Sequence, residues 1–433
     1  MKRKLIQSFI ILSASTAITK IFSIINKMIL SRLISSEAMS LFILVIPSLS
    51  LAITLGHLGI PSAIFRLVAN PKYNNKKVIV TSVILSIISC LTLIIGIIIC
   101  SPYISYNLLN NPNSYYPILS LVVFIPVVAI SGILKNYFLA KENVYLIAKA
   151  QVLEEIGRLI FSYLMIKYIL PQNDIIQVTF IFLAMSFGEI ISIIYMFMRL
   201  KQKTNFSFKY FSQFKENFIL KPILSIALPV TGIQLMHTIV HFLEPIVLFF
   251  VLSTSLTQSK IQSEYAIISG FVISILMTPT FFNTIVYRIF LPIITRDLIQ
   301  GKLKTIHQHL MIAILASLGI ALPFSLIFYF YGDYCLLLLY NTTNGTKELA
   351  YLAFPFMLVY IQTPLSAVLQ ALNKNKTLFF IGFMECLLEF SMTYFLAPIY
   401  GVKIIAISLL AGLFFSVFIS AILVFYEIYI KKV

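Results

Sequence analysis

Hydrophobic residues fill long, uninterrupted stretches of this 433-residue chain, and short polar segments separate them. Each stretch is long enough to cross a hydrocarbon core of about 30 Å as a helix. The stretches lack the strict polar and apolar alternation of transmembrane β-strands. Because lipid offers no hydrogen bonds to the backbone, a spanning segment without that alternation must form a helix, which pairs its backbone groups internally. We therefore predict an all-α, polytopic membrane protein with about twelve transmembrane helices, at residues 5–33, 38–69, 78–101, 115–139, 145–169, 175–199, 222–252, 262–290, 306–331, 346–372, 376–398 and 401–429.

The polar pattern recurs in the second half of the chain, which predicts two six-helix bundles. With six spans in each half, corresponding helices run in the same sense, as in parallel repeats related by a pseudo-twofold axis normal to the membrane. We assign residues 1–200 to the first bundle, 201–221 to a basic and aromatic cytoplasmic linker, and 222–433 to the second bundle. The recurring residues are Pro47, Pro61, Arg66 and Glu154 in the first half, and Pro279, Pro292, Arg296 and Glu385 in the second.

Composition and charge agree with this fold and predict its orientation. Hydrophobic residues make up 60% of the chain and charged residues only 11%, which excludes a single soluble globule. The net charge is +17, and most lysines and arginines fall in alternate connections, on the same side as both termini. The positive-inside rule therefore predicts cytoplasmic termini. Orientation and attraction to anionic lipids explain the basic excess better than nucleic-acid binding does.

Two lysines lie inside the first apolar run, where a charge costs at least a few kcal/mol unless it faces protein or water. Lys20 and Lys27 are seven residues apart, so they share nearly the same helical face. Ser13, Thr16 and Ser23 fall close to that face. A polar, cationic stripe of this kind predicts a cavity for an anionic ligand.

The fifth and seventh spans carry further polar residues at helical spacing. Glu154 and Arg158, four residues apart, either bind substrate or neutralise one another. His237, His241 and Glu244 are candidates for coupling transport to Na⁺ or H⁺, since buried titratable groups in membranes mark ion pathways. Their spacing also suits zinc, but zinc sites usually need ligands from other elements, so we predict no metal site. The remaining polar candidates are Gln151, Glu155, His57, Glu189, Arg288, Glu385 and Glu389.

Two short motifs resemble those of a known family. The run Gly59-Ile60-Pro61-Ser62-Ala63-Ile64-Phe65-Arg66-Leu67-Val68 and the run Gln151-Val152-Leu153-Glu154-Glu155-Ile156-Gly157-Arg158 are similar to signatures of polysaccharide-biosynthesis membrane proteins of the stage V sporulation protein B type. These proteins belong to the multidrug, oligosaccharidyl-lipid and polysaccharide flippase superfamily. The resemblance implies a cationic central cavity formed by Lys20, Lys27, Arg32 and Arg66, with Arg288 as a further member. Lipid II flippases of this superfamily typically have fourteen spans and arginines in the first helix, whereas this chain has twelve predicted spans and lysines.

The resemblance and the residues together predict a transporter rather than an enzyme. The expected substrate is a lipid-linked oligosaccharide or peptidoglycan precursor with an anionic pyrophosphate headgroup, moved across the bacterial cytoplasmic membrane by alternating access without a cofactor. Cell-wall biogenesis and sporulation are the implied processes. An ion-coupled antiporter for cationic drugs is one alternative. A membrane glycan polymerase or glycosyltransferase is another, but the longest predicted external loops, residues 102–114 and 332–345, contain Asp333 as their only carboxylate.

Overall fold

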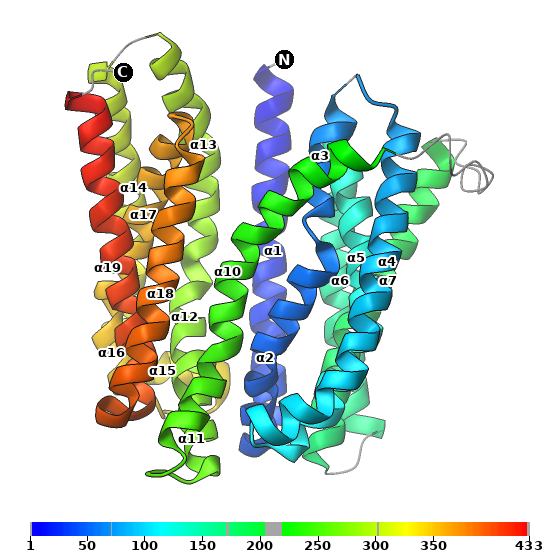
Figure 1. Ribbon diagram of the computed structural model, residues 1–433, viewed down its shortest axis with the longest axis vertical. Coiled ribbons are helices and arrows are strands. Elements are labelled where there is room, and N and C mark those ends of the chain that lie inside the picture. The colour runs from blue at the N-terminus through cyan, green and yellow to red at the C-terminus, as the bar shows by residue number, and fades with distance from the viewer. Residues whose placement is uncertain (1, 71, 170–172, 204–218, 301–302, 431–433) are drawn as a thin grey trace. The chain divides into compact units, whose positions relative to one another are not determined.

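The computed structural model describes residues 2–70, 72–169, 173–203, 219–300 and 303–430, and nearly all of them are helical (Figure 1). No β-strand occurs in these ranges. The α-helices are α1 (Lys2–Leu33), α2 (Ser36–His57), α3 (Ile60–Ala69), α4 (Asn75–Tyr103), α5 (Tyr115–Ala140), α6 (Val144–Leu164), α7 (Asp174–Lys203), α10 (Leu220–Leu252), α11 (Gln258–Tyr265), α12 (Ser274–Met277), α13 (Phe281–Ile299), α14 (Leu303–Phe330), α15 (Gly332–Tyr340), α16 (Thr346–Ala353), α17 (Leu358–Ala371), α18 (Asn375–Tyr400) and α19 (Ile404–Phe425). Short 3₁₀- or π-helical segments are η1 (Ile104–Leu108), η2 (Pro112–Ser114), η3 (Met165–Ile169), η4 (Ala266–Ile273), η5 (Thr278–Thr280), η6 (Pro355–Met357), η7 (Gly401–Lys403) and η8 (Tyr426–Ile430).

The helices confirm a polytopic, all-helical membrane protein. By length and composition, eight helical segments of the described residues could cross a membrane, or nine if the bent pair Thr346–Ala353 and Pro355–Ala371 is one span. One of the eight, Asn375–Ile428, contains both α18 and α19, which pack against each other. The count is compatible with the twelve predicted spans.

The chain forms two compact units, Met1–Phe242 and Leu243–Val433, and the boundary falls inside α10. Within each unit the helices pack in a similar pattern: α5 contacts α4 and α7, and α6 contacts α7, in the first; α17 contacts α14 and α19, and α18 contacts α19, in the second. This similarity supports the predicted internal repeat. Most of the predicted linker, residues 204–218, lies outside the described part of the chain.

A tight turn of the same geometry joins corresponding helices in both units. After α5, Glu142 adopts a left-handed φ of 57°, and the Asn143 amide donates to the Phe138 carbonyl at 2.9 Å. After α17, Asn373 has a φ of 59°, and the Lys374 amide donates to the Leu369 carbonyl, also at 2.9 Å. The shared turn places Glu154 of α6 and Glu385 of α18 at the same distance from the start of their helices, as the sequence pattern predicted.

The second predicted span is broken just before Pro61. Helix α2 ends at His57, and Leu58 and Gly59 have φ values of 43° and 61° before α3 begins. Glycine is needed at position 59 for two reasons, since a Cβ there would meet a left-handed backbone and lie 2.4 Å from the Ala227 carbonyl oxygen of α10. The break lets α10 approach the chain closely at this point.

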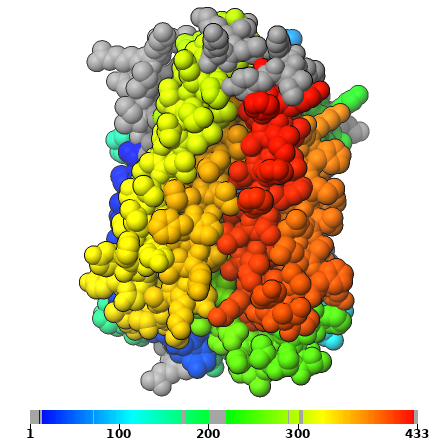
Figure 2. Space-filling view, turned by 90° about the vertical axis from the view of Figure 1, so that its left-hand side faces the viewer, coloured from blue at the N-terminus to red at the C-terminus, as the bar shows by residue number. Residues whose placement is uncertain are grey.

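Apolar side chains form both the interior and much of the surface of each unit. In the first unit, a core around Ile64, Ile133 and Ile223 joins α3, α5 and α10. The face of the second unit in Figure 2 is made largely by α14, α19 and neighbouring helices. Helix α19 exposes Phe414 and Phe418. Exposed aromatic and aliphatic side chains on long helices are what a lipid-facing surface requires.

Candidate functional site

A buried ion network joins three helices of the first unit. The Lys135 ammonium on α5 lies 2.7 Å from Glu154 Oε2 on α6 and 3.0 Å from Glu189 Oε2 on α7. Both glutamates are buried, with 7% and 5% of their surface exposed. One ammonium therefore pairs with two carboxylates from different helices, and each pair is a charge-assisted hydrogen bond.

Arg158 extends the network by one turn of α6. Its Nη2 lies 3.1 Å from Glu154 Oε1, and its Nη1 lies 3.2 Å from Glu155 Oε1. The predicted ion pair between Glu154 and Arg158 is therefore formed. Spacings of three and four residues bring these charges onto one helical face. We call Lys135, Glu154, Glu155, Arg158 and Glu189 the ion network; it holds three carboxylates against two cations.

The close approach of α6 and α7 positions the network. A Cβ on Gly188 would lie 2.6 Å from the Glu154 carbonyl oxygen and 3.1 Å from Arg158 Cβ. A Cβ on Gly157 would lie 2.3 Å from Ile191 Cδ1. Gly188 faces backbone and leaves no room for a side chain, whereas Gly157 faces the end of the Ile191 side chain. The close contact at Gly188 brings Glu189 to the level of Glu154.

Helix α1 carries the cations that the sequence assigned to a substrate cavity, and it packs against α6. Lys20 is exposed, and it acts electrostatically on Glu155 from beyond ion-pair distance. Lys27 is half-buried. Arg32 is exposed in the last turn, where its Nη1 donates to the Met28 carbonyl at 2.8 Å. The described sequence of α1 contains no Asp or Glu, so its own charge is entirely positive.

The second-span candidates lie on either side of the helix break. His57 ends α2, and its Nε2 lies 3.2 Å from the Val128 carbonyl oxygen of α5. The ring also interacts electrostatically with Glu189 and Lys135, so it lies near the ion network. Arg66 is exposed in the last turn of α3.

The remaining predicted site residues are spread over α10 and α13. His237 and His241 are exposed on α10, in the first unit. Glu244, on the same helix but in the second unit, is half-buried and acts on the buried Tyr265 hydroxyl. The side chain of Arg288, on α13, lies outside the described residues. Among the described residues, no group of three His, Cys, Asp or Glu side chains is placed to hold a metal ion.

The second unit has acids where the first has its ion network. Glu385 lies in α18 at the position of Glu154 in α6, and its carboxylate accepts a hydrogen bond from Ser416 of α19. Glu389, one turn on, corresponds to Arg158, and a Cβ on Gly412 would lie 2.7 Å from its Oε1. Each unit thus has, within itself, a close contact between two helices beside two ionisable side chains. Arg158 of the first unit is replaced by Glu389 in the second.

Comparison with known proteins identifies the family. The profile of the family described as "Polysaccharide biosynthesis protein" matches residues 5–297. The chain belongs to this polysaccharide biosynthesis family. Stage V sporulation protein B of Bacillus subtilis (strain 168) is 27% identical over 428 residues, which cover 95% of this chain and 82% of that protein. Sporulation protein YkvU of the same organism is 21% identical, covering 94% and 91%. The resemblance seen in the sequence is confirmed.

Solved structures show that this family member has a transporter fold. A multidrug resistance MATE family transporter of the MOP superfamily, in an inward-facing conformation, superposes with a TM-score of 0.71 at 15% identity, covering 96% of this chain and 95% of that one. A MOP superfamily transporter from Pyrococcus furiosus, described as having a binding pocket of reverse polarity that suggests a different function, gives a TM-score of 0.64, also at 15% identity, with 99% and 96% covered. At these identities the likeness concerns the fold alone.

The sequence indicated Arg158 as a partner of Glu154, but it did not reveal that Lys135 and Glu189 lie beside them. In the sequence alone, Lys135 is one of many lysines that agree with the predicted orientation, and Glu189 is one of several scattered polar candidates. Each is a single charge in an otherwise apolar stretch, and only the packing of α5, α6 and α7 brings them together. The usable signal was the presence of one cation and two acids within neighbouring spans, since a charge inside a membrane usually has a partner.

Proposed function

We propose that this protein is a flippase that moves a lipid-linked glycan across the bacterial cytoplasmic membrane, and that it carries out no catalysis. Its family and its transporter fold support this function. The observation that carries the proposal is Lys20, an exposed ammonium well inside the 32-residue helix α1. Such a charge is costly unless water or a ligand meets it.

The ion network makes Lys20 available to a ligand. Glu154 already pairs with Lys135 and Arg158, Glu189 with Lys135, and Glu155 with Arg158. Lys20 balances the remaining negative charge only from a distance. A pyrophosphate, with several negative charges and strong acceptor oxygens, would attract this ammonium far more than the shared carboxylate does. Lys27, Arg32 and Arg66 would add positive potential.

Transport requires the cavity to open alternately, and the α2–α3 break offers a place for this motion. A helix interrupted by left-handed residues at Leu58 and Gly59 bends there more easily than a continuous one. The sequence has no nucleotide-binding motif, so an uphill step would draw on an ion gradient. Glu244, with His237 and His241, is our proposed coupling group.

The direct test is a flipping assay in proteoliposomes. A fluorescent polyprenyl-pyrophosphate oligosaccharide on the inner leaflet should become accessible to an external quencher or glycosidase when the protein is present. Protein-free vesicles and a zwitterionic phospholipid probe are the controls. If the protein does not accelerate translocation of the glycan lipid above the phospholipid probe, the proposed function is wrong.

A cation antiporter is the second candidate, and Glu385 favours it. This half-buried acid is bonded to Ser416, and the ion pairs within the described residues do not include it. An acid without a fixed cation suits a positively charged substrate. Accumulation of a cationic dye in everted vesicles, lost in Glu385→Gln and unaffected in Lys20→Ala, would favour this candidate over the flippase.

Replacement of the coupling group should separate transport from assembly. In Glu244→Gln we expect a several-fold loss of ion-dependent flipping with normal yield, because the amide keeps the side chain's shape and removes its charge and proton. The measurement is flipping rate against external pH and sodium. Glu264→Gln, another half-buried acid of the second unit, is the matched control. Wild-type rates and an unchanged ion dependence in Glu244→Gln would remove Glu244 from the mechanism.

The proposed orientation has its own test. A reporter that is active only in the cytoplasm should be active when fused after Lys209 and inactive when fused at Asn111, because basic connections stay inside. Cell fractionation with activity measurement of both fusions gives the answer. The reverse pattern would invert the topology and leave the flippase proposal standing.

A further inference from the structure

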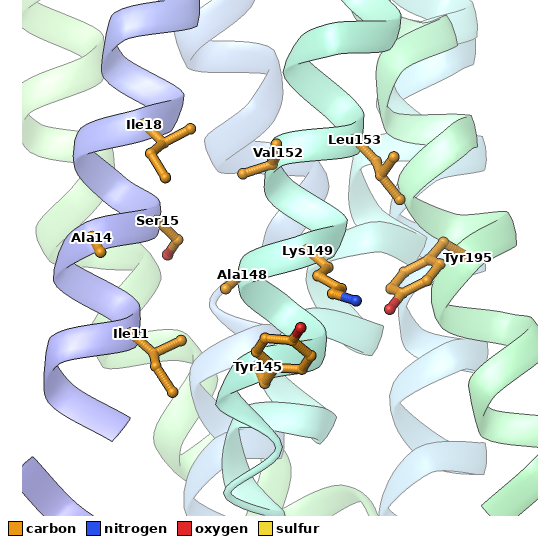
Figure 3. A pocket seen from close by; sticks show the side chains of 10 residues that line it. All are labelled: Ile11, Ala14, Ser15, Ile18, Tyr145, Ala148, Lys149, Val152, Leu153 and Tyr195. Atoms are coloured by element: carbon orange, nitrogen blue, oxygen red, sulfur yellow. The ribbon is translucent and has the colours of Figure 1, made fainter. Parts of the chain in front are cut away.

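Helices α1, α6 and α7 of the first unit enclose a groove that the proposed transport function does not use (Figure 3). Its volume is about 570 Å³, within the roughly 300–1,000 Å³ of small-molecule sites. Ala14, Ile18 and Leu153 are exposed along it, so the groove is open at its side. The lining residues are Ile11, Ala14, Ser15, Ile18, Tyr145, Ala148, Lys149, Val152, Leu153 and Tyr195.

Three of the four polar side chains of the groove lie together, and Ser15 of α1 lies apart from them. In Figure 3 the Lys149 ammonium points toward the Tyr195 hydroxyl, and the Tyr145 hydroxyl lies beside them. Lys149 Nζ is 4.7 Å from the centre of the Tyr145 ring, and the Arg199 guanidinium is 5.8 Å from the centre of the Tyr195 ring. The Lys149 ammonium and two phenols therefore form a small cationic end of the groove, with Arg199 near the Tyr195 ring, and this end matches a phosphate group.

The cationic end lies at the depth expected of lipid headgroups. Tyr145 and Lys149 belong to the first two turns of α6, which begins at Val144. Tyrosine and lysine near the end of a membrane-spanning helix typically mark the interface between headgroups and hydrocarbon. From there the groove continues along Ile18, Val152 and Leu153, deeper into the span. A headgroup at one end and a hydrocarbon chain along the walls is the arrangement of a membrane lipid.

We propose that this groove is a binding site for one anionic glycerophospholipid of the surrounding membrane. Its phosphate binds Lys149 and the Tyr195 hydroxyl, and one acyl chain lies between α1 and α6. The single charge of a phosphodiester matches the single ammonium that lines the groove. A pyrophosphate-linked glycan would need more cations and several polar groups for its sugars, and the walls beyond the tyrosines offer no cation and only the Ser15 hydroxyl. The site is therefore separate from the proposed substrate site at Lys20.

Titration by native mass spectrometry of the purified full-length protein tests the site. Dioleoyl phosphatidylglycerol should bind more tightly than dioleoyl phosphatidylcholine. Lys149→Gln should lower the affinity for phosphatidylglycerol roughly tenfold, because it removes a charge-assisted bond, and should leave phosphatidylcholine unaffected. Ala14→Phe, which fills the open side of the groove, should weaken both lipids. Lys376→Gln, which removes an exposed lysine from the first turn of α18, should behave as wild type.

Three outcomes would overturn the proposal. Equal affinity of the wild type for the two lipids would show that the groove does not discriminate between anionic and zwitterionic headgroups. Wild-type affinity for phosphatidylglycerol in Lys149→Gln would place the anionic site elsewhere. Displacement of phosphatidylglycerol by an equal concentration of polyprenyl phosphate would show that the groove takes the glycan carrier and not a bulk lipid. Thermal midpoints of every variant, measured in lipid-free micelles, identify any that fail to fold.

Discussion

Replacing Lys20 or Lys27 with alanine should weaken binding of a lipid-linked glycan by roughly ten- to a hundredfold, because each ammonium would contribute about 1.5–3 kcal/mol to holding a pyrophosphate. The folded protein should persist in Lys20→Ala, since this side chain is exposed and acts on Glu155 only from a distance. Binding of a fluorescent pyrophosphate-linked probe and the flipping rate in proteoliposomes are the two measurements.

The charge of the replacement separates recognition from structure. Arginine at position 20 or 27 should retain much of the binding, and glutamate should abolish it, because the ligand requires positive charge more than ammonium shape. Lys72→Ala, an exposed lysine in the turn between α3 and α4, is the matched control. Wild-type flipping by both alanine variants would reject the cationic site, and the antiporter would become the better candidate.

Replacing Lys135 with alanine should be the most damaging single change to stability in the first unit, at about 3–5 kcal/mol. The ammonium lies 2.7 Å from Glu154 and 3.0 Å from Glu189, so its loss leaves two buried carboxylates side by side. The repulsion between the two carboxylates and the cost of burying their charge without Lys135 both lower the stability of the variant. The yield of monodisperse protein and its thermal midpoint in detergent report the effect.

Neutralising the acids should rescue that variant. Lys135→Met combined with Glu154→Gln and Glu189→Gln should recover most of the lost stability, because a buried ion network replaced as a whole by neutral groups costs little. Lys221→Met, on the exposed surface of α10, provides the comparison for lysine loss in general. A Lys135→Ala protein as stable as the Lys221→Met protein would show that the network contributes nothing to the fold.

Most of the fold could be predicted from sequence because lipid imposes simple rules. Runs of apolar residues had to become helices. Gly59 followed by Pro61 is a pattern typical of the break that separates α2 from α3. The repeat was visible in the spacing of Glu154 and Glu385 from their turns, and the turns after α5 and α17 share one geometry. Local patterns of this kind can be recognised in the sequence without knowledge of how the helices pack.

The site was only half visible because helical spacing shows which face is polar but not which helix covers it. The pair Glu154 and Arg158 followed from a spacing of four, whereas Lys135 and Glu189 each stand alone in their spans. Their meeting depends on the close contact at Gly188, which no periodicity encodes. The groove between α1, α6 and α7 could not be predicted for the same reason, since its polar lining residues, Ser15, Tyr145, Lys149 and Tyr195, come from three different helices.

The way that one ammonium is shared among three helices constrains the transport cycle. If α5 slid against α6 or α7 by one helical turn, about 5 Å, at least one buried carboxylate would lose its ion pair with Lys135. These three helices should therefore travel as one rigid piece. Conformational change in the first unit would then involve movement of α1 against α6 and bending at the break between α2 and α3.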